Sequence, residues 1–167
     1  MPTLIVTPSG TTSNAYITEA EGDTYHEGRL NNSEWTAGTQ ANKEASIIWA
    51  TRVLDSMFEW KGSTSDSEQA LDWPRIGVYN KKNQYLDSEA IPREVKDATA
   101  ELAFQLIKQD RLVIDEPDSS GVKSFSLGSI KFAFDPKDRA DLIPSWVQTL
   151  LAPLSTSTGS TVSLRRG

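Results

Sequence analysis

The chain has 167 residues, 23 of them acidic and 17 basic, which gives a formal charge of −6, and it contains no cysteine. The missing cysteines exclude disulfides, thiol catalysis and Cys-ligated zinc, and the acidic balance argues against a dedicated nucleic-acid binder, which usually carries a basic surface. No apolar run is long enough to cross a bilayer, and Met1–Val6 lacks the basic start of a signal peptide, so we expect one globular domain assembled in a reducing cytoplasm.

The N-terminal part predicts one short strand and one short helix. The strand is Leu4–Thr7, bounded by prolines on both sides. Thr18 followed by Glu21 has the form of a capping box, so a helix is expected from Glu19 to about Glu27, ending near Gly28. The segment from Asn31 to Gly38, rich in Asn and Ser, predicts a loop that holds Trp35.

Lys43–Trp60 is predicted as the first long helix, ended by Gly62. Its apolar residues form two neighbouring stripes, wider together than a simple surface helix needs: Ile47, Ala50, Leu54 and Phe58 in one, and Trp49, Val53, Met57 and Trp60 in the other. A polar loop follows over 63–67, then one turn of helix within Gln69–Arg75, broken at Pro74, and an irregular segment from Gly77 to Asp87.

Pro92–Asp110 is predicted as the second long helix, with proline at its first position. It also carries two apolar stripes, on roughly opposite sides: Val95, Ala98, Leu102 and Leu106, and then Ala100, Phe104 and Ile107. One face is expected to join the chain's own core. The other face can contact a neighbouring element or a neighbouring subunit, and we take Ala100, Phe104 and Ile107 as candidate inter-subunit contacts.

The C-terminal third predicts a β-hairpin, a short helix and an extended arm. Apolar residues alternate with small or charged ones over Val122–Phe134, around Gly128-Ser129, and a short helix is expected from Ile143 through Leu151. Ser155–Thr161 is a linker of Ser, Thr and Gly. The fold class is therefore mainly α: a small helical domain over 1–154 with one hairpin at about 122–134, and a flexible C-terminal arm over 155–167.

The arm predicts a docking strand. Val162 and Leu164 alternate with polar residues, and Arg165 and Arg166 follow, a pattern suited to a strand added to the edge of a partner sheet. Trp73-Pro74-Arg75 has two interpretations. Either Trp73 fills the core at a fixed turn, or the rigid corner holds Arg75 out to pair with carboxylates of a partner.

No group of residues in the sequence predicts catalysis. His26 is the single histidine and has no cysteine or second histidine with which to share a metal, so a surface or partly packed residue is expected. Acidic residues gather at 110–118 and at 135–141 without the spacing of a calcium loop. We expect no catalytic, cofactor-binding or metal-binding residues, and no enzyme.

Four stretches resemble, in order and spacing, the small head-tail connector (neck adaptor, head completion) proteins of tailed bacteriophages, some of which carry the label of DnaT-like single-stranded-DNA-binding proteins. They lie between residues 14 and 105: Asn14–Ile17 with Glu19–Glu21, Ala50–Asp55 running into Trp60–Gly62, Gln69–Arg75, and Ile91-Pro92 with Val95, Ala98 and Glu101–Ala103.

The resemblance implies a structural protein at the virion neck. It implies a homo-oligomeric ring of twelve copies that docks on the portal protein, meets a further neck or tail-completion protein, and surrounds double-stranded DNA without sequence recognition. Portal docking would then use the predicted strand, Val162, Leu164, Arg165 and Arg166.

Two other classes of function stay open. A replication accessory protein that binds single-stranded DNA would need basic residues beside exposed aromatics, and Lys81-Lys82 with Tyr79 and Tyr85 is the one local hint. A solvated loop explains these residues as well. A small hydrolase would need a nucleophile beside a base, and no such motif is present.

Overall fold

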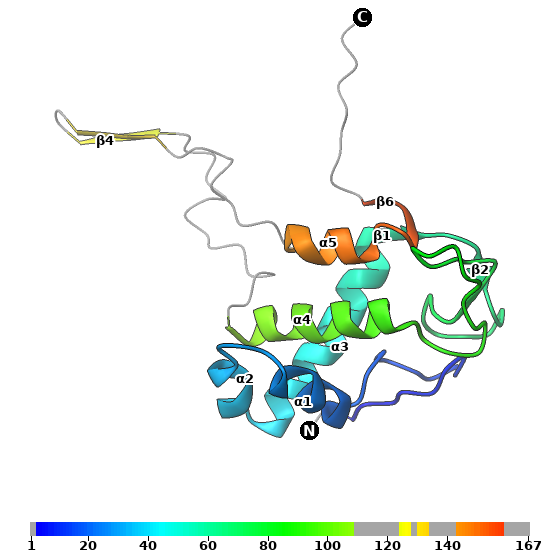
Figure 1. Cartoon of the computed structure of the whole chain (residues 1–167). Coiled ribbons are helices and arrows are strands. Elements are labelled where there is room, and N and C mark those ends of the chain that lie inside the picture. Colours follow the sequence, from blue (N-terminus) through cyan, green and yellow to red (C-terminus); the bar gives the residue numbers. More distant parts are fainter. Residues whose placement is uncertain (1–2, 109–123, 128–129, 134–142, 159–167) are drawn as a thin grey trace, which may run out of the picture.

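A computed structural model describes residues 3–108, 124–127, 130–133 and 143–158. Within these residues the chain is mainly helical, as predicted. The centre of the body is the pair α3 (Gln40–Met57) and α4 (Arg93–Lys108), which pack against each other. On one side of α4 lie α1 (Glu19–Glu27) and α2 (Ser33–Ala37), and on the other lies α5 (Ser145–Leu151) (Figure 1). The bounds of α1 are those predicted. Helix α5 ends at Leu151 as predicted but begins at Ser145, two residues after the predicted start.

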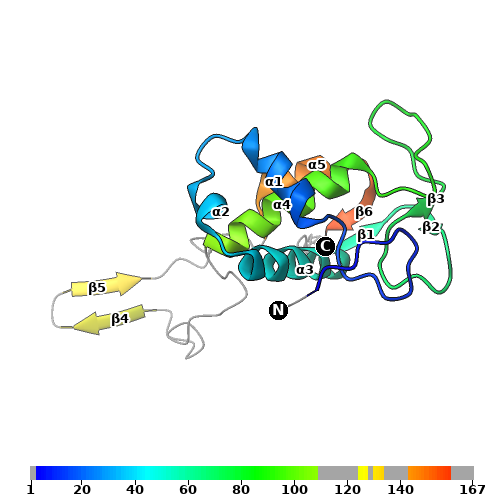
Figure 2. The ribbon, with the colours of Figure 1, turned by 90° about the horizontal axis from the view of Figure 1, so that it is seen from below.

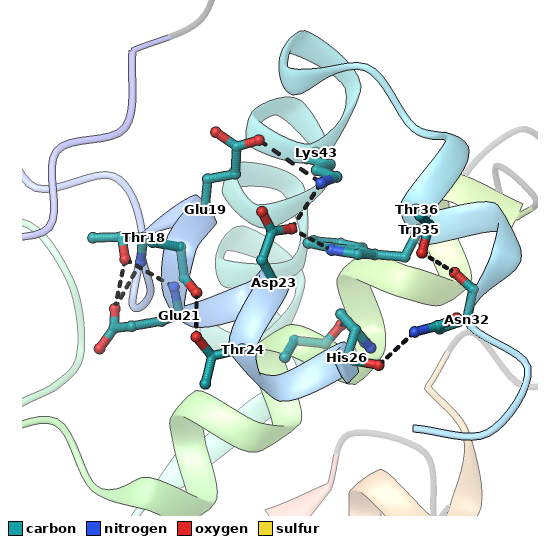
Figure 3. Close-up of polar contacts among 12 residues, drawn as sticks. Thr18, Glu19, Glu21, Asp23, Thr24, His26, Asn32, Trp35, Thr36 and Lys43 are labelled. Atoms are coloured by element: carbon teal, nitrogen blue, oxygen red, sulfur yellow. Dashed lines mark hydrogen bonds and ion pairs between the residues drawn. The ribbon is translucent and has the colours of Figure 1, made fainter. Parts of the chain in front are cut away.

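The capping box begins α1 as predicted. The Thr18 hydroxyl accepts a hydrogen bond from the Glu21 backbone N–H at 3.2 Å, and the Glu21 carboxylate accepts one from the Thr18 N–H at 2.8 Å (Figure 3). Both bonds satisfy N–H groups that have no partner within the first turn of the helix.

Replacing Thr18 with alanine should therefore lower the free energy of unfolding by about 1 kcal/mol. Thr24→Ala is the matched control, because the Thr24 hydroxyl donates only to the Ala20 carbonyl within the same helix, at 2.9 Å. Urea titrations followed by circular dichroism would measure both variants. A Thr18 variant that is no less stable than the Thr24 variant would contradict the capping role.

The segment predicted as a loop around Trp35 is instead the short helix α2. The Asn32 carbonyl accepts from the Thr36 N–H at 3.0 Å and from its hydroxyl at 3.1 Å. The Trp35 indole N–H donates to Asp23 of α1 at 2.7 Å, and Lys43 of α3 donates to the same carboxylate at 2.7 Å (Figure 3). Five residues are too few to show a helical period in the sequence. Helix α2 is instead stabilised by contacts with the rest of the chain, such as the bond from Trp35 to Asp23.

The first long helix ends earlier than predicted. It begins after Thr39, whose hydroxyl accepts from the Asn42 N–H at 3.3 Å, and ends at Met57. Phe58–Trp60 forms strand β1, in which Phe58 and Trp60 are buried and Glu59 is exposed. The apolar residues at 58 and 60 therefore follow the period of two that is typical of a strand. Both residues also fit the two helical stripes, so this period was not recognised in the sequence.

Part of the predicted flexible arm is strand β6 (Ser155–Thr158). It pairs antiparallel with β1, with Phe58 opposite Thr158 and Trp60 opposite Ser155, and the Lys61 ammonium donates to the Pro153 carbonyl at 2.8 Å. The helical body therefore extends to Thr158 and not to Leu154. Strand β6 was not predicted, because its partner β1 lies in a segment whose apolar pattern predicted a helix.

Two further predictions are wrong. Leu4–Thr7 is extended but forms no strand with the described residues. Instead the Ile5 N–H donates to the Asn14 side chain at 2.8 Å. The predicted helical turn within Gln69–Arg75 is also absent. Its end forms strand β3 (Arg75–Ile76), which pairs with β2 (Ser63–Thr64).

The predicted hairpin is confirmed, with β4 (Ser124–Leu127) antiparallel to β5 (Ile130–Ala133). Ser124 lies opposite Ala133 and Leu127 opposite Ile130. In the described part of the chain, neither strand pairs with a strand of the helical body, and both views draw the hairpin apart from the helices (Figures 1 and 2).

Candidate functional site

An open groove with a volume of about 1030 Å³ lies between α1 and α4. Apolar side chains contribute to its lining, among them Ile17 before α1, Ala20 in α1 and Ile91 before α4. Three ion pairs also line it, formed by Glu21 with Lys96, Arg93 with Asp97, and Arg29 with Glu101. The groove is therefore partly apolar and close to neutral.

The Arg29–Glu101 pair is the most buried of the three, since only 5% of Glu101 is exposed. The Tyr25 hydroxyl donates to the same carboxylate at 3.1 Å, and the Arg29 guanidinium lies 4.4 Å from the centroid of the Phe104 ring. A buried carboxylate needs such partners, because burial without them strongly disfavours its charge. No pattern in the sequence predicted this pair, whose members are 72 residues apart.

The two outer pairs are more solvent-exposed. The Lys96 ammonium lies 2.6 Å from the Glu21 carboxylate, and the Arg93 Nε lies 3.2 Å from the Asp97 carboxylate. Burial raises the pKa of Glu21, but the hydrogen bonds from Lys96 and Thr18 and the charge of Lys96 together outweigh it, so the pKa is lowered. Because each carboxylate in the groove has a cationic partner, the groove suits a docked chain segment better than a phosphate.

A second polar cluster is buried under the Trp73–Pro74–Arg75 corner. The Tyr16 hydroxyl donates to Asp55, and the Asp72 N–H donates to the other Asp55 oxygen at 3.4 Å. The pKa of Asp55 is raised to about 7, mainly by burial and also by the neighbouring Asp72 carboxylate, although the hydrogen bond from Tyr16 acts in the opposite direction. Trp73 is 1% exposed and packs edge-on against Trp60 at 5.6 Å, so it fills the core.

Arg75 makes its hydrogen bonds inside its own chain. Its guanidinium donates to the backbone carbonyls of Lys61 at 2.8 Å, Gly62 at 2.9 Å and Asp72 at 3.1 Å. Arg75 thus holds the turn between β1 and β2, and these bonds occupy donors that one of the two interpretations of the Trp73–Arg75 corner assigned to a partner.

The second stripe of α4 is covered by the chain's own helices. Ala100 and Phe104 are 1% and 3% exposed, and Ile107 is partly buried against the same core. The Phe104 ring lies 5.4 Å from the ring of His26, which is itself 1% exposed. The burial of Ala100 and Phe104 therefore needs no neighbouring subunit.

His26 is a core residue, not the surface or partly packed residue expected. Its Nε2 lies 3.1 Å from the Ala100 carbonyl and donates to it, and its ring lies 4.4 Å from the Trp35 ring. Burial lowers the pKa of His26 to about 4, so the imidazole is neutral at pH 7. Its apolar surroundings could not be read from the sequence, because they come from three separate helices.

The predicted docking residues Val162, Leu164, Arg165 and Arg166 lie outside the described residues. In the described part of the chain, no group of three or more His, Cys, Asp or Glu side chains could hold a metal ion. Among the helices of these same residues, none is long and apolar enough to span a membrane.

Tyr79 and Tyr85 form an exposed aromatic pair at the ends of a short loop. They face each other in an isolated antiparallel bridge, with ring centroids 5.5 Å apart and an interplanar angle of 78°. Lys81 and Lys82 lie between them and are exposed. The structure thus brings together the four residues that the sequence suggested for a nucleic-acid contact.

Comparisons with known proteins give one match. A family model described as "Putative DnaT-like ssDNA binding protein" matches residues 2–167, nearly the whole chain. No curated protein and no solved structure matches significantly.

Proposed function

We propose that this chain, which belongs to the DnaT-like ssDNA binding protein family, is a structural virion protein, one subunit of the head-to-tail connector ring of a tailed phage. The ring, of twelve copies, docks on the portal protein, extends the channel for double-stranded DNA and offers an attachment surface to a further neck or tail-completion protein. It is assembled in the host cytoplasm and stays at the neck of the virion.

The hairpin is the observation that carries this proposal. Its two four-residue strands pair with each other and with no strand of the described body. An isolated two-stranded hairpin is at best marginally stable in water, so a partner surface would stabilise it. In a ring, the hairpins of neighbouring copies and the portal supply that surface.

The stretches that resemble connector proteins also build the core of the body. Tyr16, Trp73 and Leu102 come from three of these stretches, and each is at most 1% exposed. The net charge of −6 suits a channel wall, since a protein that does not neutralise phosphates lets DNA pass without holding it.

Replacing residues 124–133 with a Gly-Ser linker of the same length tests the proposal. We expect an unchanged helical circular dichroism spectrum, a melting temperature within about 2 °C of the wild type, and at least tenfold weaker assembly on purified portal rings, measured by mass photometry. The control is Tyr79→Ala with Tyr85→Ala, which changes another exposed part of the chain and should assemble normally. A hairpin-less protein that assembles as well as the wild type would contradict the proposal.

A second candidate function is a replication accessory protein that binds single-stranded DNA. The family description and the exposed Tyr79–Tyr85 pair favour it. The two functions differ in a simple assay: the accessory protein would bind single-stranded DNA at physiological salt without portal, whereas the connector would join portal rings without added DNA.

A further inference from the structure

We propose that neighbouring copies of the chain contact each other head to tail, with Trp49 of one copy inserted into the groove between α1 and α4 of the next copy. The inference rests on the proposed ring and deepens it, because it names the two surfaces that meet. Each surface is formed by described residues of the helical body.

One face of α3 is exposed and carries a large aromatic side chain. Asn42, Trp49 and Ser56 follow one another at intervals of seven residues, so they share one side of the helix, and all three are exposed. Ile47 lies on nearly the opposite side and is 0% exposed. Trp49 belongs to an apolar stripe predicted from the sequence, yet 49% of its surface is exposed. A large apolar surface of this kind is stabilised when a partner covers it.

Arg52 adds a positive charge beside the exposed indole. Its guanidinium carbon lies 5.2 Å from the centroid of the Trp49 ring. The two side chains form one surface, the Trp49–Arg52 patch, which combines an aromatic ring with a cation. Tryptophan and arginine are enriched among the residues that contribute most to the affinity of protein interfaces. The patch therefore has the chemistry of a protein contact.

The groove between α1 and α4 can receive this patch. Its volume of about 1030 Å³ leaves room for an indole ring, and its lining includes the apolar residues Ile17, Ala20 and Ile91. Pockets that bind an aromatic side chain have such a lining, with a few polar groups that fix its orientation. The groove therefore offers an apolar environment to Trp49 of a neighbouring copy.

The wall of the groove also offers a carboxylate to Arg52. Burial raises the pKa of Asp97, and the ion pair with Arg93 only partly offsets this shift. The Arg93 side chain is 88% exposed, whereas that of Asp97 is 23% exposed. A second cation would stabilise the charge of this half-buried carboxylate. The charges of the patch and of this part of the groove are therefore complementary.

The patch and the groove lie on different sides of the same chain. Of the described residues, those that line the groove come from α1, α4 and the segments beside them, and none comes from α3. Figure 2 shows α3 along one edge of the helical body, with α1 and α4 beside it. Complementary surfaces at different places on identical subunits form head-to-tail contacts, which close into a ring where the rotation allows it. A second copy of the chain therefore supplies what each surface lacks.

Variants of both surfaces test the contact by mass photometry of the full chain with purified portal rings. Trp49→Ala should weaken assembly at least about tenfold, because it removes the aromatic side chain at the centre of the interface. Ala20→Arg, which places a long charged side chain in the groove, should weaken assembly to a similar extent. The matched control is Trp146→Ala, which removes an indole that is 42% exposed on α5 and should leave assembly unchanged.

Crosslinking tests which residues meet, because the chain has no cysteine of its own. Trp49→Cys and Ala20→Cys in one chain, treated on portal rings with a short bismaleimide, should give a covalent ladder longer than a dimer. An equal mixture of the two single variants should stop at the dimer. Trp49→Cys alone should give no crosslinked product, since a head-to-tail contact does not bring two copies of Trp49 together.

Two results would overturn the inference while the ring proposal stands. In the first, the wild type joins portal rings and both Trp49→Ala and Ala20→Arg join them equally well. In the second, the double cysteine variant joins portal rings without forming the ladder, or Trp49→Cys crosslinks to itself. If Trp49→Ala loses its helical circular dichroism, Ala20→Arg and the ladder decide. A wild type that does not join portal rings would overturn the ring proposal and this inference together.

Discussion

Gly62→Ala is expected to lower the free energy of unfolding by at least about 3 kcal/mol. Gly62 has a φ of +73°, in the left-handed region where a side chain is strained. A Cβ added there would overlap the Ile76 carbonyl oxygen and lie 2.8 Å from the Val78 side chain. Relieving the overlap would separate β2 from β3 and disturb the Gly62 carbonyl that Arg75 holds.

Gly77→Ala measures the effect of backbone strain without the steric overlap that an added Cβ meets at Gly62. Gly77 has a similar φ of +82°, but the nearest atom to an added Cβ is 3.9 Å away. This variant should lose only about 1 kcal/mol, the strain of the backbone conformation alone. Urea unfolding followed by tryptophan fluorescence would measure both. If the two variants lose the same stability, the close approach of residues 62 and 76 is not present in solution.

Asp55→Asn should change how stability depends on pH. Burial raises the pKa of Asp55 to about 7 in the folded chain, from about 3.9 when unfolded. Between these values the folded state holds the proton more tightly, so the contribution of Asp55 is greatest at low pH and is lost as pH rises through 7. At 1.36 kcal/mol per pKa unit, the loss between pH 5 and pH 8 is up to about 3 kcal/mol.

His26 makes the stability of the fold depend on pH in the opposite direction. Its pKa is lowered to about 4 by burial, so the unfolded chain binds the proton more tightly between pH 4 and 6.5, and stability rises with pH in that window. In the wild type the two effects oppose each other. In Asp55→Asn, only the His26 effect of the pair remains.

Urea unfolding at pH 5, 6, 7 and 8 would measure these slopes. We expect the Asp55 variant to gain stability from pH 5 to 6.5 more steeply than the wild type, and to exceed the wild type at pH 8. The control is Asp87→Asn, which removes an exposed charge while its side chain can still accept from the Glu89 N–H. A variant curve parallel to that of the wild type would contradict the raised pKa of Asp55.

Local signals made much of the fold predictable. The capping box at Thr18 and Glu21 fixed the start of α1, and alternation around residues 128–129 indicated the hairpin. The errors arose where a distant partner decided the structure. Phe58 and Trp60 fit the helical stripes equally well, and β6 is needed to make them a strand.

The candidate sites also differ in whether their residues are close together in the sequence. Tyr79, Lys81, Lys82 and Tyr85 lie within seven residues, so the sequence could suggest them together. The groove could not be predicted, because Arg29 and Glu101 are distant in sequence and the stretch that contains Glu101 does not indicate its partner. Two apolar stripes on α4 were compatible with a neighbouring subunit or with the chain's own helices, and α1 and α2 cover the second stripe.

Electron microscopy of portal rings, alone and mixed with the full chain, tests the connector proposal most directly. We predict an added closed ring of twelve copies, coaxial with the portal, with the β4–β5 hairpins packed against neighbouring copies or against the portal. Portal particles that look the same with and without the chain, while the chain itself stays monomeric, would contradict the account.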